Sequence, residues 1–138
     1  LSYGWHGREK LTEGEWARWT SSENAFIDIP KLLPAANYVI SFRAGFYTLD
    51  QMQGFRFTVN GEHIPMESVR CDELSETQQI YTCRIRGDLI NKCQDYIRLG
   101  WAVDSLVNPA QATGESDNRD LGVYLWWCGI DNANPAFQ

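Results

Sequence analysis

Apolar and polar residues alternate with a period of two along most of this chain, and this alternation restricts the possible folds more than any other feature. Residues 55–59 place three apolar side chains on one face and then meet Asn60-Gly61. That dipeptide favours a tight β-hairpin because both of its positions tolerate positive φ. We expect the return strand over residues 62–66, with Pro65 limiting it to the edge of a sheet.

The same alternation recurs in other short segments separated by turn residues, which indicates an antiparallel arrangement. The further predicted strands are residues 25–29, 38–44, 79–85, 96–103 and 121–130. Helical signal is weak: residues 87–92 predict one turn with Asp88 as its N-cap, and residues 104–120 predict a long loop. We therefore predict an all-β fold, an antiparallel two-layer β-sandwich.

Composition sets the broad class of the protein. The 138 residues fit a single domain over residues 1–138, and 43% hydrophobic content suffices for a packed core. A net charge of −6 without any basic run disfavours nucleic-acid binding, which requires clustered lysine and arginine. No apolar run reaches the length of a membrane span, so we expect no direct membrane insertion.

The four cysteines, Cys71, Cys83, Cys93 and Cys128, contain no C-x-x-C pair, and two histidines are too few to favour a zinc site. Cys83 and Cys128 fall in predicted strands, where a free cysteine is usually a small buried apolar residue. We favour reduced thiols. The alternative is a disulfide that joins Cys71 to Cys93 or Cys83.

Motifs for enzymatic chemistry are missing from the sequence. It has no G-x-S-x-G nucleophile elbow, no phosphate-binding glycine loop and no acid at motif spacing from either histidine. Eighteen acidic residues make accidental carboxylate pairs common, so a glycosidase-like hydrolase is a distant alternative. We predict no catalytic residue, no metal site and no cofactor.

Two segments combine charges with aromatic rings, near opposite ends of the chain. Residues 16–20 read Trp-Ala-Arg-Trp-Thr, and residues 116–122 read Ser-Asp-Asn-Arg-Asp-Leu-Gly before an apolar strand. Aromatic rings stack on sugars while arginine and acids bind hydroxyl groups, so the segments are candidates for a sugar site. The structural alternative, which we rank first, buries Trp19 in the core and pairs Arg18 with Asp117 or Glu9.

The adjacent residues Trp126 and Trp127 present a similar choice. Neighbouring strand residues point to opposite faces, and Trp127 is in register with Leu125. We expect Trp127 in the core and Trp126 on the other face beside Tyr124. That other face is covered, offered to a partner, or used as a ligand platform.

Five segments in order give the chain a family resemblance: residues 4–9 (Gly-Trp-His-Gly-Arg-Glu), 16–20, 59–61 (Val-Asn-Gly), 108–109 (Asn-Pro) and 116–122. The chain resembles the β-sandwich accessory domains of bacterial glycosyltransferases and related enzymes of cell-surface polysaccharides. The resemblance implies a jelly-roll-like sandwich, similar to carbohydrate-binding modules, without a catalytic centre. It also implies a cytoplasmic piece of a larger protein, with any membrane association through that parent, and the first residue, Leu1, fits an excised domain.

The leading hypothesis is a non-catalytic glycan-binding module in surface-polysaccharide (O-antigen or capsule-type) biosynthesis. Its expected partners are a polysaccharide or oligosaccharide and the catalytic domain of the parent protein. The alternative is a structural domain without a ligand, which packs on a glycosyltransferase domain or on a second copy of itself. We expect Asp117 and Arg119 to tie the last strand to residues 16–20. The candidate carbohydrate-binding residues are Trp5, Trp16, Arg18, Tyr124, Trp126, Asp117 and Arg119.

Overall fold

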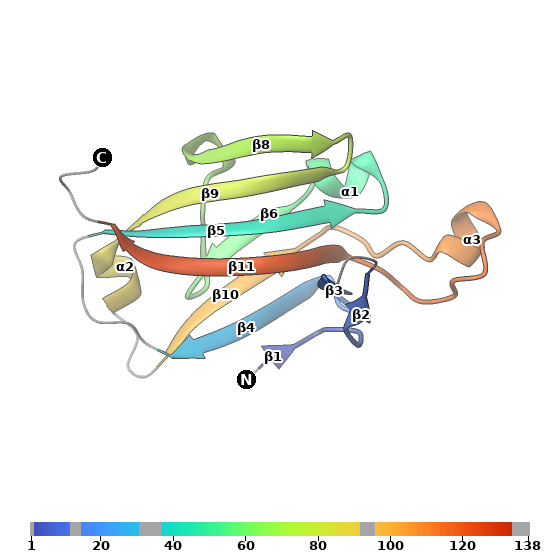
Figure 1. The fold of residues 1–138 in the computed structure, drawn as a ribbon, viewed down its shortest axis with the longest axis horizontal. Coiled ribbons are helices and arrows are strands. Elements are labelled where there is room, and N and C mark those ends of the chain that lie inside the picture. Colours follow the sequence, from blue (N-terminus) through green and yellow to red (C-terminus); the bar gives the residue numbers. More distant parts are fainter. Residues whose placement is uncertain (1, 12–14, 31–36, 92–95, 134–138) are drawn as a thin grey trace.

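The computed structural model describes residues 2–11, 15–30, 37–91 and 96–133. Within these ranges the strands form two antiparallel sheets that pack face to face (Figure 1). The five-stranded sheet has the order β1 (Ser2–Tyr3), β4 (Asn24–Pro30), β10 (Tyr96–Ala102), β6 (Arg56–Val59) and β7 (Glu62–His63). The six-stranded sheet has the order β2 (Glu9–Lys10), β3 (Trp16–Trp19), β11 (Val123–Ala133), β5 (Asn37–Phe46), β9 (Gln78–Arg86) and β8 (Val69–Ser75).

The core lies between the sheets and is built from alternate residues of the central strands, as the period-two pattern requires. Aromatic rings form its centre: Phe42 of β5 contacts Phe57, Tyr81 and Trp101 at centroid distances of 4.7, 5.0 and 5.7 Å. The predicted all-β, two-layer antiparallel sandwich is confirmed. The jelly-roll connectivity stays a prediction.

The predicted hairpin turn is present, with φ of 53° at Asn60 and 83° at Gly61. The predicted return strand over residues 62–66 is wrong in length. β7 ends at His63, and a 3-10 turn, η2 (Met66–Ser68), follows Pro65, which has no N–H for a ladder. The strand is therefore a short edge.

The short helices are α1 (Leu49–Gln53), α2 (Gly87–Asn91) and α3 (Pro109–Thr113). α2 confirms the predicted turn, but Asp88 lies inside it and is not its N-cap; the predicted final residue, Lys92, lies outside the described residues. α3 interrupts the predicted loop over residues 104–120. The Asn108 side chain accepts a hydrogen bond from the Gln111 N–H, Pro109 begins the helix, and Gly114 ends it in the left-handed region. Figure 1 shows α3 beyond the end of the sheets.

A β-bulge in β11 corrects the prediction that Trp127 is a core residue. Leu125 pairs with Ala44 and Trp127 pairs with the next residue back, Arg43, so Trp126 is an extra residue between them. The alternation of inward and outward side chains along β11 therefore shifts by one residue after the bulge. Cys128 and Ile130, instead of Trp127, pack against the core. Trp127 keeps 44% of its surface exposed.

Cys71, Cys83 and Cys128 are free thiols, so no disulfide joins Cys71 to Cys83, while Cys93 lies outside the described residues. Burial raises the pKa of Cys83 and of Cys128 to about 12, which keeps both thiols protonated at neutral pH. Among the helices that the structure describes, none has the length and apolar character to cross a bilayer.

Candidate functional site

The two charged aromatic segments meet because β3 and β11 are neighbours in the six-stranded sheet. Thr20, the residue after β3, joins β11 through its N–H and through its hydroxyl, which accepts a hydrogen bond from the Val123 N–H at 2.8 Å. The Gly122 N–H donates to the Thr20 carbonyl at 3.0 Å. A Cβ on Gly122 would overlap the Thr20 hydroxyl, which explains why glycine precedes the last strand.

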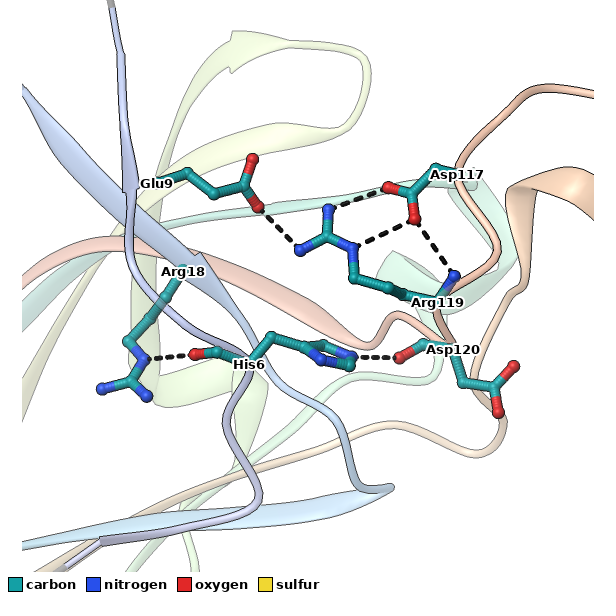
Figure 2. Close-up of polar contacts among 6 residues, drawn as sticks. All are labelled: His6, Glu9, Arg18, Asp117, Arg119 and Asp120. Carbon is teal, nitrogen blue, oxygen red and sulfur yellow. Dashed lines mark hydrogen bonds and ion pairs between the residues drawn. The ribbon is translucent and has the colours of Figure 1, made fainter.

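Arg119 lies at the centre of an ion-paired cluster with Glu9 and Asp117, which we call the clasp (Figure 2). Its Nη2 and Nε donate to the two Asp117 carboxylate oxygens at 2.8 and 3.0 Å, and its Nη1 donates to Glu9 Oε2 at 3.1 Å. The Arg119 hydrogen bonds lower the pKa of Asp117 to about 2. The clasp joins the long loop to β2.

Arg18 is not a member of the clasp, contrary to the predicted pairing with Asp117 or Glu9. Its Nε donates to the His6 carbonyl at 3.0 Å, and its guanidinium lies 5.4 Å from the centre of the Trp5 ring. Figure 2 shows it directed away from Arg119. Residues 18 and 119 therefore have separate roles. Arg119 connects the long loop to Glu9 of β2 and not, as was predicted, to residues 16–20. His6, which precedes β2, adds a second contact with this loop, because its Nε2 lies 2.8 Å from the Asp120 carbonyl oxygen.

Trp5 and Trp16 lie apart from the clasp. Trp5 packs edge-on against Trp101 at 5.7 Å and donates its indole N–H to the Phe26 carbonyl at 3.0 Å, so its polar atom is already used. Trp16 is 45% exposed, and the Arg8 guanidinium lies 4.9 Å from its ring centre. Trp16 is the first residue of β3 and pairs with Lys10 of β2.

A second group of aromatic side chains gathers on the outer surface of the six-stranded sheet, and we call it the ring platform: Trp19, Tyr124 and Trp126. The Trp19 and Tyr124 ring centres are 4.5 Å apart, and those of Tyr124 and Trp126 are 4.7 Å apart. The predicted burial of Trp19 in the core is wrong, because Trp19 pairs with Tyr124 and shares its outer face. The pairing places both rings in one group.

The ring platform borders an open hollow of about 280 Å³. Its lining is Trp19, Gly45, Phe46, Tyr47, Gln78, Tyr124 and Trp126. Gly45 allows Trp126 to pack closely, since a Cβ there would lie 3.0 Å from the indole, which would have to shift slightly. The bulge places Trp126 over this glycine, so the same irregularity that exposes Trp127 also builds the hollow.

Polar groups at the hollow are oriented by the protein. Arg43 lies over the Trp126 ring at 4.3 Å and donates to Gln78 Oε1 at 3.3 Å. This bond leaves the Gln78 amide N–H groups without a partner among the described residues. Burial raises the pKa of Tyr124, and the nearby Glu9 charge adds to the shift, so its hydroxyl stays protonated and able to donate.

The structure therefore separates the predicted site residues. Tyr124 and Trp126 line the hollow, Asp117 and Arg119 belong to the clasp, and Trp5, Trp16 and Arg18 are part of neither. Sequence reasoning did not identify Gly45, Arg43 or Gln78 as candidates. The sequence carries little sign of their role, because Gly45 lies opposite both Tyr124 and Gln78 only through the register of the paired strands.

The arrangement offers stacking surfaces and hydrogen bonds. No cluster of three or more potential metal ligands occurs within the described ranges. Asp117, with its pKa lowered, stays ionised and is unsuited to the role of a general acid, which needs a raised pKa. Comparison with protein-family models, curated protein sequences and solved structures finds no match for this chain.

Proposed function

We propose that this domain is a non-catalytic glycan-binding module and that the ring platform is its binding surface. The observation that carries the proposal is the hollow of about 280 Å³ beside three contacting aromatic rings. Aromatic side chains present apolar surface to the C–H groups of a sugar, while the Gln78 amide and Tyr124 hydroxyl are placed for its hydroxyl groups. The ligand class is an uncharged or weakly charged saccharide.

Rigidity supports this assignment. Trp126 is held by three neighbours: Gly45 lies close to its indole, Arg43 lies over its ring, and the Tyr124 ring packs against it at an interplanar angle of 75°. A preorganised ring loses little conformational freedom when a ligand binds, which reduces the entropic cost of association. The platform therefore suits weak binding of a repetitive polymer.

In this proposal the module belongs to a larger cytoplasmic protein of bacterial surface-polysaccharide biosynthesis, with a jelly-roll fold and no catalytic centre. Tethering would hold the growing polymer near the catalytic domain, because a linked site raises the effective concentration of its ligand. The bulge and the clasp would then serve to present the rings.

Isothermal titration of the folded domain with bacterial surface polysaccharides, together with a glycan array, tests this proposal. The expected result is binding that Trp126→Ala reduces at least tenfold, which corresponds to about 1.4 kcal/mol. Trp127→Ala is the matched control, because that tryptophan is adjacent in sequence but does not line the hollow. Absence of binding at millimolar saccharide, or an equal loss in both variants, contradicts the proposal.

The exposed Trp127, with 44% of its surface accessible, favours a second candidate function, a structural domain that docks on a neighbouring domain or on a second copy. Sedimentation of the isolated domain over a range of concentrations tests self-association. A concentration-dependent dimer that Trp127→Ala abolishes supports this function, and a strict monomer contradicts the self-association.

A further inference from the structure

The outer surface of the five-stranded sheet carries a second concave site, opposite to the ring platform. A cross-strand row runs over β1, β4, β10, β6 and β7. Each residue pairs with the next in the order Tyr3, Phe26, Gly100, Thr58 and His63. Leu99 and Trp101 are buried in the core, so the row faces outward. Its centre is a residue without a side chain.

Gly100 opens a hollow of about 290 Å³ in the middle of this sheet. A glycine weakens the interior of a strand and often marks a position where another group approaches the backbone closely. The Thr58 side chain lies where a Cβ on Gly100 would lie, so the present Thr58 rotamer requires glycine here. The floor of the hollow is therefore formed by the Gly100 backbone together with the Thr58 side chain that packs against it.

Arg98 forms one wall of this hollow and is rigidly held. Its Nε and Nη2 donate to the two carboxylate oxygens of Asp28 at 2.7 and 2.9 Å, and its guanidinium lies 3.7 Å from the centre of the Phe26 ring. The Arg98 hydrogen bond lowers the pKa of Asp28, so both groups stay charged and cancel. The wall is preorganised and carries no net charge.

A second hollow of about 250 Å³ adjoins the first and shares Gly61 and Arg98 with it. Asn60 and Tyr96 complete its lining, and Tyr96 is 45% exposed. Together the two hollows form a trough along β10, which we call the glycine trough. The two adjoining hollows offer room for a ligand of at least two linked units.

Polar side chains at the glycine trough are available to a ligand. The Asn24 amide, the Thr58 hydroxyl and the His63 imidazole have no hydrogen-bond partner among the described residues, and all three line the larger hollow. They provide donors and acceptors without an uncompensated lysine or arginine. This chemistry fits a polyhydroxylated neutral ligand and disfavours a phosphate or another anion.

We infer that the glycine trough is a second saccharide site, which binds a neutral oligosaccharide independently of the ring platform. The ligand class rests on the proposed function, whereas the location rests on Gly100 and its row. Because the two sites lie on opposite sheets, one module would hold two glycan segments. Two sites raise the avidity for a polymer beyond the affinity of either site.

Amide chemical-shift mapping of the domain tests this inference, with maltohexaose, cellohexaose and chitotetraose as probes. In the Trp126→Ala variant we expect a probe still to shift residues 24–26, 58–63 and 98–102. The double variant Thr58→Val/His63→Ala should raise the dissociation constant fitted to those shifts about tenfold. Shifts at the platform should stay unchanged. Both of its changes are on the outer face, and a dispersed spectrum confirms that it folds.

The outcomes separate the two proposals. Shifts confined to residues 19, 45, 78 and 124–126 overturn the glycine trough and leave the proposed function standing. Shifts at the trough alone support the second site and overturn the ring platform as a binding surface. If neither region responds to the three probes or to the surface polysaccharides, both proposals are overturned.

Discussion

The clasp is built from charged side chains and the ring platform from aromatic ones, and the two groups also differ in how far the protein itself supplies their partners. In the clasp, the Arg119 guanidinium is bound on two sides by Asp117 and Glu9. In the platform, rings contact one another and still border an open hollow. The comparison shows that a side chain from such a segment has a structural role when other residues of the protein satisfy its interactions. It is a candidate for ligand binding when part of its surface stays open to solvent.

The two arginines make the same contrast. Arg119 uses three of its nitrogens in hydrogen bonds. Arg43 stacks on Trp126 and lies 3.8 Å from Glu15, while its Nε is buried without a hydrogen-bond partner in the described part of the chain. Arg119 thus fixes a loop, whereas Arg43 chiefly supports a ring.

Of the four changes that follow, the one at the hydrogen-bonded contact between Thr20 and β11 should lower the free energy of unfolding the most. Thr20→Val removes the acceptor of the buried Val123 N–H and should lower the free energy of unfolding by about 1–3 kcal/mol. Chemical denaturation measures the loss. Thr82→Val is the matched control on β9, for which we expect a change within about 0.5 kcal/mol. Equal effects would contradict a structural role for the Thr20 hydroxyl.

Arg119→Ala should have the next largest effect. It removes the two-point pair with Asp117 and the bond to Glu9, and we expect a loss of about 1–2 kcal/mol because the groups are partly exposed to solvent. Arg70→Ala provides the control, since the Arg70 side chain is 76% exposed and, among the residues that the structure describes, forms an ion pair with Asp72 alone. Glycan binding at the platform should persist in both variants. If it disappears with Arg119 while stability is unchanged, the clasp is a site.

The pH dependence of Asp117 should be smaller still. Its pKa is lowered to about 2 in the folded protein, against about 3.9 in an unfolded chain. A lowered folded-state pKa gives stability that is complete above about pH 4 and is lost as the pH falls towards 2. The stability advantage of the wild type over Asp117→Asn should therefore shrink across this interval. A constant difference down to pH 2 would contradict the pairing with Arg119.

Sequence alone predicted the sandwich because its determinant is local. The alternation of apolar residues and the Asn60-Gly61 turn act within a few positions, and the structure retains both. The meeting of residues 16–20 with residues 116–122 was also anticipated, and the hydrogen bond from the Gly122 N–H to the Thr20 carbonyl shows it. The partner of Arg18 was not, since the choice between a carboxylate and a backbone carbonyl, here that of His6, depends on three-dimensional distances.

The β-bulge marks the limit of prediction from periodicity. A single extra residue at Trp126 reverses the faces of every following residue of β11, and no turn residue announces it in the sequence. The hollow depends on the same register, because Gly45 lies beneath the indole. Candidate binding residues could be named by type, but their grouping required the pairing of strands.

The smallest expected effect is at Trp127, and it tests the bulge directly. If Trp127 were a core residue, Trp127→Ala would cost about 3–5 kcal/mol, as expected for Trp101→Ala at a position with 1% exposure. With 44% of its surface exposed, Trp127 should cost about 1 kcal/mol or less. Chemical denaturation of the two variants side by side measures the difference. Similar losses would mean that β11 keeps regular alternation, and the hollow beside Trp126 would then lose its structural basis.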